Sequence, residues 1–433
     1  MCKILIQNLG PIKNVEFTLN RVNVITGPQC SGKSTIAKVV STCSWIEKNV
    51  IQKQTFSHVT REFFETSLFC YHQLDKYPQR ANVKILYEGD AVFMEYSNET
   101  FEIHEGPQFE DKSVGKVAYL PAERNIASLE NVESFKLPDV NIRGYLWDWF
   151  IIRTKYTSSS PLELFSLGIK YYYSKENGDV LVLEDGNEIP LNAASSGLQS
   201  VTPLYACLHY MTSWIYQNKE DKSYEKQKEE ETAILRRIIH HISTENGVNL
   251  SMDKINEEFI EDLKNLFSKK IDNSHLDNEM IQKSKIAQKV LQIENSLSLP
   301  HYSKIILEEP ELNLFPQSQI DLTYDILKMI DVSRDTLFVN THSPYILYAL
   351  NNCMLGGLLI DKIDDNALLA RKNSFINPKD VSVWELRDGE FSSMQDNENK
   401  TIQDKEGLIR SNYFDRVMQN VMADFRNLMN YHD

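Results

Sequence analysis

The chain has 433 residues, of which 42% are hydrophobic and 25% are charged, and its formal net charge is -15. These proportions are ordinary for a folded protein, and they exclude wholesale disorder and a membrane-embedded chain. The length suits one large domain with insertions, or two domains, and the acidic balance disfavours broad wrapping of nucleic acid while leaving a local basic groove possible.

Hydropathy and cysteine usage narrow the cellular context. No apolar run approaches the roughly 20 residues that span a bilayer, and the start "MCKILIQNLGPIK" lacks the apolar segment of a secretory signal. We therefore expect a cytoplasmic protein with no membrane partner. The cysteines show no CxxC pair and no regular spacing with histidine, which favours reduced thiols over disulfides or a zinc site; they are Cys2, Cys30, Cys43, Cys70, Cys207 and Cys353.

The first 120 residues alternate between strand and helix signals. Residues 3–19 predict two strands around a turn at Gly10 and Pro11, and "RVNVITG" predicts a third, short strand that ends in glycine. A helical stripe begins at once in "KSTIAKVVSTCSWI". Residues 83–120 again indicate strands and turns and end in "KVAYLPAERN".

The middle of the chain changes character twice. Residues 131–186 are rich in aromatic side chains, which we expect to pack in the core, and "VLVLEDGNEIPL" predicts a hairpin with Asp-Gly at its turn. The segment "SSGLQSVTPLYACLHYM" predicts a loop that enters a helix. Residues 215–299 are charged, amphipathic and nearly free of proline and glycine, which indicates a helical insertion.

Strand signals return after residue 300. "SKIILEE" predicts a strand, residues 316–331 a helix, and "TLFVNTHSPYIL" a strand followed by a helix that starts at Ser-Pro. The tail contains a hairpin-like piece, "VSVWELRDGEF", and a last amphipathic helix, "YFDRVMQNVMADFRNLM".

One stretch carries a phosphate-binding pattern, G-x-x-x-x-G-K-[ST], between a predicted strand and a predicted helix. Glycines let successive backbone N–H groups turn toward a phosphate, and the helix N-terminus adds positive potential. Lys33 is expected to reach the β- and γ-phosphates of ATP, and the Ser34 hydroxyl to bind Mg²⁺. The alternative is a glycine turn that carries Lys and Ser by chance. The stretch consists of Gly27, Pro28, Gln29, Cys30, Ser31, Gly32, Lys33 and Ser34.

A second stretch ends a predicted strand in acid. In "KIILEE" the apolar residues predict a buried strand, and Glu308 and Glu309 follow them. Alone, such glutamates are most often a solvated turn. Together with the phosphate-binding pattern, they predict that Glu308 binds Mg²⁺ and that Glu309 acts as the base toward the attacking water.

Two further pieces are weaker when taken alone. His342 follows a short strand and precedes a Ser-Pro turn, where a histidine is either structural or a hydrogen-bond donor to the γ-phosphate. "SSGLQ", from Ser195 to Gln199, is either an ordinary turn or an anion site at a helix N-terminus.

In this order the four pieces resemble the ABC-type ATPases of the SMC/RecF/OLD group. "GPQCSGKST" resembles Walker A, "SSGLQ" the ABC signature, "IILEEPELNLFP" Walker B with the D-loop, and "NTHSPYIL" the His switch. The doubled Glu, "EPE" and "THSP" are most similar to stand-alone OLD-like bacterial ATPases found in anti-phage defence systems. The resemblance covers residues 1–208 and 301–391, and "YLPAERN" lies near the place of the Q-loop.

This resemblance implies a fold and a site. The fold is an α/β P-loop NTPase with an ABC-type head, a mixed sheet flanked by helices, plus an α-helical insertion. The ATP and Mg²⁺ would be sandwiched between two subunits, so Ser196, Gly197 and Gln199 would act in trans, and Thr35 would complete the Walker A contacts. Three departures stand out, namely Glu308 in place of the usual Asp, Leu198 in place of the second signature glycine, and Gln29 in place of Asn.

The resemblance also divides the chain. Residues 1–208 and 301–391 would form the ATPase head, 209–300 the helical insertion and 392–433 a C-terminal helical tail. OLD nucleases continue into a Toprim domain with a Glu and a DxD; "LLIDKIDDNALL" lacks that pattern, so we expect no nuclease activity in this chain.

Three functions remain open on the sequence. The first is an ATP-hydrolysing sensor or scaffold, a homodimer or higher homo-oligomer that controls a separate nuclease or toxin effector in anti-phage defence. The second is a RecF- or SMC-like DNA repair or chromosome-maintenance clamp, because DNA remains a possible partner. The third is a binding module with a dead site, which Lys33, Ser34, Glu309 and His342 argue against.

Overall fold

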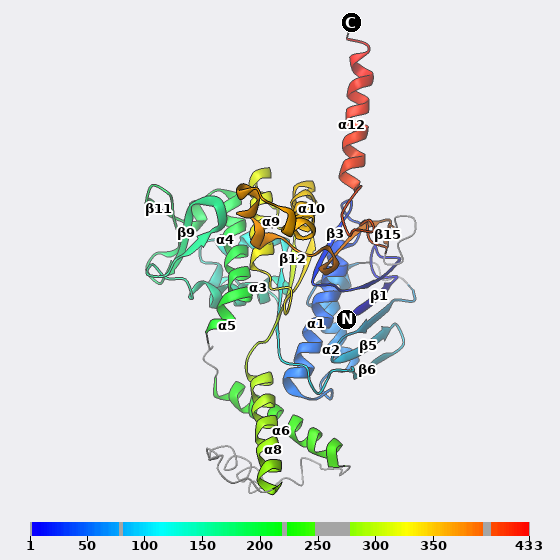
Figure 1. Cartoon of the computed structure of the whole chain (residues 1–433), viewed down its shortest axis with the longest axis vertical. Helices are drawn as coiled ribbons and strands as arrows, with labels where there is room; N and C mark the ends of the chain where they lie inside the picture. The colour runs from blue at the N-terminus through cyan, green and yellow to red at the C-terminus, as the bar shows by residue number, and fades with distance from the viewer. Residues whose placement is uncertain (1, 78–80, 219–222, 247–277, 393–399, 433) are drawn as a thin grey trace.

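The computed structural model describes residues 2–77, 81–218, 223–246, 278–392 and 400–432 (Figure 1). Its main sheet has eleven strands in the order β6-β5-β4-β1-β2-β15-β14-β3-β13-β12-β7. The predicted fold class, a mixed α/β sheet flanked by helices, is confirmed, with the glycine-rich loop between β3 and α1. No helix in the described residues is long and apolar enough to cross a membrane.

The main sheet has a parallel half and an antiparallel half. The strands of the parallel half run side by side in one direction, and they are β3 (Val22–Thr26), β7 (Lys116–Leu120), β12 (Ser303–Glu308), β13 (Thr336–Asn340) and β14 (Val381–Arg387). The antiparallel half comprises β1 (Lys3–Gln7), β2 (Asn14–Thr18), β4 (Lys84–Glu88), β5 (Val92–Ser97) and β6 (Phe101–Glu105). The short strand β15 (Glu390–Phe391) joins the halves, pairing with β14 and, at Asn14, with β2.

Each face of the parallel half supports its own core because side chains alternate along a strand. Ile305 and Leu307 of β12 face one cluster, which includes residues of α3 (Asn141–Arg153), α4 (Ser196–His209), α9 (Pro316–Met329) and α10 (Pro344–Leu359). Ile306 faces the other cluster, with residues of α1 (Lys33–Lys53) and of the antiparallel half. The strand is therefore buried on both sides, as its apolar run predicted.

A second sheet lies beside α3 and α4 (Figure 1). Its strand order is β11-β10-β9-β8, and its strands are β8 (Leu162–Leu164), β9 (Ile169–Ser174), β10 (Gly178–Val182) and β11 (Glu188–Pro190). The hairpin predicted in "VLVLEDGNEIPL" is confirmed as β10–β11. The hairpin-like piece predicted in "VSVWELRDGEF" is confirmed as β14–β15. Tyr171 of β9 lies in the core, as expected of the aromatic segment.

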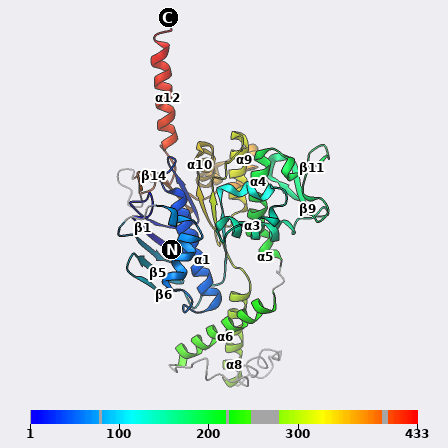
Figure 2. The same ribbon diagram turned by 180° about the vertical axis from the view of Figure 1, so that it is seen from behind.

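The segment predicted as an insertion is helical where the structure describes it. Its helices are α5 (Ile215–Gln217), α6 (Tyr224–Asn246) and α8 (Asn278–Ser298), and residues 219–222 and 247–277 lie outside the described residues. Arg236 and Arg237 attach α6 to the end of α1, because they donate to the Lys53 carbonyl (2.8 Å) and to Gln54 Oε1 (3.0 Å). Both views place α6 and α8 at the opposite end of the molecule from α12 (Figures 1 and 2).

The tail is only partly helical. Lys400–Asn412 forms no helix, and Ile402 N donates to the Val383 carbonyl at 2.9 Å, so this stretch lies along β14. The predicted last helix is confirmed as α12 (Tyr413–Met429). Among the described residues, α2 (Arg61–Glu65) and α11 (Asn366–Leu369) are further short α-helices. All six cysteines are free thiols, as expected.

Candidate functional site

The loop between β3 and α1 is held in a conformation that only glycine permits at two positions. Gly27 has φ 148°, and a Cβ there would lie 2.2 Å from the Leu386 carbonyl oxygen of β14. Gly32 has φ 108°, and a Cβ there would lie 2.4 Å from Ile12 Cδ1. The two glycines thus allow β14 and the β1–β2 turn to close around the loop.

The Lys33 side chain lies back along the loop. Its Nζ donates to the carbonyls of Gly27 (2.9 Å) and Pro28 (2.7 Å) and approaches Ser31 Oγ at 3.4 Å. Burial lowers the pKa of Lys33 to about 8, while the charges of Glu309 and Glu311 act in the opposite direction. A buried ammonium with only carbonyl and hydroxyl partners is suited to an incoming phosphate.

The parallel strands bring the acidic stretch to this loop. β12 and β3 both flank β13, so their carboxyl ends meet at one edge of the sheet. The Glu308 side chain is buried, and the nearby Tyr119 and Ser34 hydroxyls favour its ionised form. Burial nevertheless raises the pKa of Glu308 to about 7, and Glu308 Oε1 has no hydrogen-bond partner in the described part of the chain.

Glu309 and His342 face each other across the same edge. Glu309 Oε1 lies 3.6 Å from His342 Nε2, and both side chains are about one third exposed, at 30% and 31%. Burial and the nearby Lys33 charge lower the pKa of His342, so its ring is neutral at pH 7. The pair borders solvent, where an attacking water could enter.

Glu309 has an unusual backbone conformation, with φ 44°. A left-handed residue other than glycine is costly and needs support from its surroundings. Arg124 supplies this support, because its fully buried guanidinium donates to the carbonyls of Glu308 and Glu309, both at 2.7 Å. The Glu309 N–H also donates to the Asn340 carbonyl at 2.9 Å.

Glu311 connects the acidic stretch to the histidine loop. Its Oε1 accepts from the His342 N–H (2.5 Å) and from Thr341 Oγ1 (3.0 Å). Burial raises the pKa of Glu311. Glu311 therefore orients the backbone that bears His342, which is a positioning role.

Three residues of this network were not predicted as site residues, namely Arg124, Tyr119 and Glu311. Arg124 and Tyr119 lie in "KVAYLPAERN", a stretch that resembles only the region of the Q-loop. The available signal was position, since Tyr119 lies at the end of β7, next to β12 in the sheet, and Arg124 follows in the turn after β7. Glu311 is part of "EPE", where the spacing alone does not reveal its partners.

The "SSGLQ" residues are placed apart from the loop around Lys33. Ser195 caps α4, with Leu198 N donating to its Oγ at 3.5 Å, and Ser196 is exposed at the helix start. Gly197 approaches the Asn313 carbonyl, to which an added Cβ would come within 2.7 Å. Gln199 Nε2 donates to the Asn192 and Ala194 carbonyls, both at 2.9 Å, rather than to the Lys33 loop.

The remaining predicted loop residues differ in exposure. Ser31, Gly32 and Thr35 are buried, and Pro28 is half-buried. Gln29, Cys30 and Ser34 are exposed, and Cys30 has φ 59°. The exposed residues are those that a ligand over the loop would meet first.

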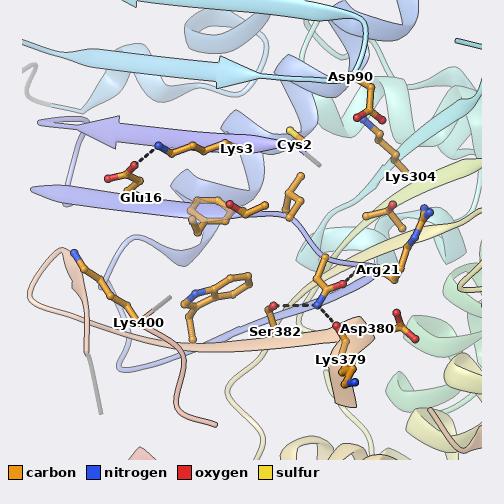
Figure 3. A pocket seen from close by; sticks show the side chains of 16 residues that line it. Cys2, Lys3, Glu16, Arg21, Asp90, Lys304, Lys379, Asp380, Ser382 and Lys400 are labelled. Carbon is orange, nitrogen blue, oxygen red and sulfur yellow. Dashed lines mark hydrogen bonds and ion pairs between the residues drawn. The ribbon is translucent and has the colours of Figure 1, made fainter. Parts of the chain in front are cut away.

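Two cavities lie near the main sheet. One, of about 740 Å³, is lined by Tyr119, the residue whose hydroxyl favours the ionised form of Glu308. The other, of about 710 Å³, opens between β2 and β14, and Figure 3 shows Lys3, Arg21 and Lys304 around it. Arg21 and Lys304 stand at the amino ends of β3 and β12, so this second cavity is at the opposite sheet edge from Lys33.

No protein-family model matches the chain, and no curated protein matches it. Among solved structures, the SMC head domain from Thermotoga maritima aligns over 80% of this chain and 90% of its own, with 9% identity and a TM-score of 0.30. The recombination mediator protein RecF aligns over 90% and 96%, with 10% identity and a TM-score of 0.28. A dimeric ATP-binding cassette bound to ADP and Pi aligns over 90% and 96%, with 11% identity and a TM-score of 0.23.

Proposed function

We propose that the chain binds ATP with Mg²⁺ and hydrolyses it. The observation that supports this most directly is that the loop after β3 and the acidic end of β12 meet at one edge of the sheet, where Ser34 is near enough to the buried Glu308 to favour its ionised form. A buried carboxylate beside the hydroxyl that follows Lys33 is the arrangement that a nucleotide-bound magnesium ion requires.

The residues present fit Mg²⁺. Ser34 and Glu308 offer hard oxygen ligands, and one buried Glu308 oxygen has no partner in the described residues. A bound cation would favour the ionised carboxylate, opposing the burial that raises its pKa. Mg²⁺ would supply neutralisation of phosphate charge there, and Ser34 and Glu308 would hold it.

Three of the chain's own groups take part in the proton and charge movements of hydrolysis. Lys33 exchanges its carbonyl partners for phosphate oxygens and holds the γ-phosphate in place. Glu309 accepts a proton from water as the water oxygen bonds to the γ-phosphorus and the bond to the β–γ bridging oxygen breaks, releasing ADP and phosphate. His342, neutral at pH 7, donates a hydrogen bond toward the γ-phosphate.

Nucleotide binding tests the first half of this proposal. We expect Lys33→Ala to lose Mg²⁺-dependent ATP binding in calorimetry, because no other described cation lies within the loop. Lys328→Ala on α9 is the matched control, since Lys328 is exposed and far from the loop in sequence. Equal ATP affinity in both variants would contradict the site.

We further propose that two copies sandwich the nucleotides, with Ser196 and Gly197 of one copy completing the other's site. The exposed start of α4 supports this, because Ser196 faces solvent while Gln199 bonds within its own loop. Lys33, Ser34 and Glu308 lie together within one copy, whereas Ser196 lies at an exposed helix start.

We propose that the output of this ATPase belongs to a separate protein, a nuclease or toxin, as in anti-phage defence. The proposal is supported by a site that accounts for nucleotide chemistry and by helices α6 and α8, which stand away from the nucleotide edge and offer a contact surface (Figure 2).

Pull-down from the native host should recover an effector with the full chain. Unchanged recovery after deletion of residues 219–299 would show that the insertion has no part in it.

The alternative is an ATP-driven DNA clamp. The acidic charge of the chain disfavours it, since phosphate affinity depends on Lys and Arg. ATP turnover with and without duplex ends discriminates the two: strong stimulation by DNA alone would favour the clamp, and no stimulation would favour the partnered ATPase.

A further inference from the structure

α12 is an amphipathic helix that stands away from the rest of the molecule (Figures 1 and 2). Its first turn is well anchored, with a capping box between Asn412 and Asp415 and a hydrogen bond from Tyr348 of α10 to Asp415 (2.6 Å). None of its 17 residues is buried. Phe414 in the first turn packs against the core of its own chain, whereas the turns beyond it are mostly exposed.

The apolar side chains of α12 form a heptad seam. They recur with alternating spacings of four and three at Phe414, Met418, Val421, Phe425 and Leu428, the pattern of a helix that packs against another helix. The outer seam residues are mostly solvent-exposed, Phe425 by 59% and Leu428 by 70%. Because Phe414 packs against the core of its own chain, we name the other four, Met418, Val421, Phe425 and Leu428, the α12 seam.

The flanks of the seam are also apolar. Val417, Met422 and Met429 widen the stripe to an arc of about 140° around the helix, at 3.6 residues per turn. Coiled-coil partners of different sequence are usually selected by paired charges beside the seam. Here only Asp415 and Asp424 stand beside it, so no charge pattern selects a different partner.

The charge of α12 favours a second copy over a membrane. The helix carries two Asp and two Arg and no Lys, so it is neutral on a chain of net charge -15. Helices that bind lipid surfaces are rich in Lys and Arg on the polar face, which α12 is not. Each copy of the chain is acidic overall. Charge repulsion between two copies is therefore least where they meet through a neutral, apolar surface such as that of α12.

The base of α12 lies at the nucleotide edge of the sheet. Arg416 forms an ion pair with Glu385 of β14, and Glu385 is in register with Thr26, the last residue of β3 before the Gly27 loop. α12 therefore projects from the same sheet edge at which the proposed ATP sandwich requires a second copy. An identical stripe on each copy is self-complementary about a two-fold axis.

We propose that the α12 seam packs against the α12 seam of a second copy of this chain, and that this contact forms without nucleotide. It would hold two heads near each other, so that closure on ATP becomes an event within one assembly. The proposal goes beyond ATP hydrolysis and does not depend on it, because the contact uses none of the nucleotide-binding residues.

Sedimentation of the full-length, nucleotide-free protein tests this contact. We expect reversible self-association of the unaltered chain, and Met418→Glu/Phe425→Glu should weaken it about thirtyfold or more, the loss typical of central apolar contacts. Asn420→Glu/Asn427→Glu is the matched control, because it places two glutamates with the same spacing on the opposite face. A monomeric unaltered chain, or equal loss in both variants, would overturn the proposal.

Cross-linking identifies the surface in contact. Val421→Cys should give a dimer with a short bis-maleimide in far greater yield than Asn420→Cys, above the background of the native exposed thiols Cys30 and Cys70. If association needs Met418 and Phe425 but Val421→Cys gives no cross-linked dimer, the α12 seam packs against a different surface of the second copy. That result would overturn seam-to-seam pairing. ATP binding by each variant confirms that its head is folded.

Discussion

The Glu308–Glu309 backbone depends on one buried guanidinium. Arg124 donates to both carbonyls, and it also donates to the Pro121 carbonyl at 3.3 Å. Burial lowers the pKa of Arg124, with the nearby carboxylates acting in the opposite direction. The residue thus fixes the orientation of the proposed base without touching the substrate.

Arg124→Met tests this positioning role. We expect kcat for ATP hydrolysis to fall about 10- to 100-fold, because a small displacement of a catalytic group has effects of that size. The Kd for ATP should change little, since Lys33 and the loop remain intact. Steady-state kinetics with calorimetric binding separates the two quantities, and equal loss of binding and turnover would argue for a general folding defect instead.

The Glu308 carboxyl makes magnesium binding depend on pH. Its folded-state pKa of about 7 lies above the ordinary 4.5, so folding favours the protonated form and the carboxyl's contribution to stability falls as pH rises from about 4.5 to 7. Mg²⁺ needs the ionised form and displaces a proton below pH 7. Apparent Mg²⁺ affinity in the presence of ATP should therefore rise from pH 6 to about pH 7.5 and then level off.

Glu308→Gln is the control for this pH dependence. Its Mg²⁺ affinity should be weaker and nearly constant over the same range, because the amide does not titrate. A rise of the same size in Glu308→Gln would assign the effect to Lys33 or to the nucleotide. Titration calorimetry in buffers with different protonation enthalpies would count the released proton directly.

At the scale of elements, α1 and β12 are joined by a buried ion pair. Lys304 Nζ lies 2.8 Å from Glu47 Oε2, and Glu47 also accepts from Tyr87 Oη (2.8 Å) and the Ala91 N–H (2.9 Å). These contacts lower the pKa of Glu47 and raise that of Lys304, so both remain charged. The helix after the phosphate loop and the strand before Glu308 are thereby fixed to each other.

Lys304→Met should therefore destabilise the fold by about 3 to 5 kcal/mol, because it leaves the buried Glu47 carboxylate without its cation. Denaturant unfolding monitored by tryptophan fluorescence measures this difference. Lys328→Met is the control and should change the free energy of unfolding by less than about 1 kcal/mol, since Lys328 is exposed. A similar small change at Lys304 would show that the pair contributes little.

Local patterns predicted the elements that carry the main motifs. β3, α1, β12 and the start of α10 each follow from a continuous stretch of apolar residues ended by glycine, acid or Ser-Pro. β8 and β9 were not predicted as strands, because β8 has three residues and the tyrosines of β9 hide any alternation. Arg124, Glu311 and Lys304 could not be assigned either, since their roles depend on which strands are neighbours in the sheet.

At the scale of the whole molecule, the account requires two copies. Site residues Lys33, Ser34, Glu308 and Glu309 meet within one chain, while Ser196 lies on the exposed start of α4. A complete site would therefore combine one copy's loop with the other copy's α4.

Mixing two inactive variants tests this sharing. Lys33→Ala removes the loop cation, and Ser196→Glu places a negative charge where the second copy's phosphates would lie, so each variant alone should lose turnover. A mixed dimer contains one intact pair, the loop of the Ser196→Glu copy with the α4 start of the Lys33→Ala copy. Mixing should restore ATP hydrolysis; no restoration, despite mixed dimers detected by sedimentation, would contradict action in trans.

The most direct test of the central claim is single-turnover hydrolysis of ATP with Mg²⁺ by the unaltered chain and by Glu309→Gln. We predict that the substitution slows hydrolysis at least 100-fold, as removal of a general base does, while ATP still binds and the ATP-bound dimer accumulates. Equal hydrolysis rates in the two proteins, or no hydrolysis by the unaltered chain, would contradict the assignment of this site as an ATPase centre with Glu309 as its base.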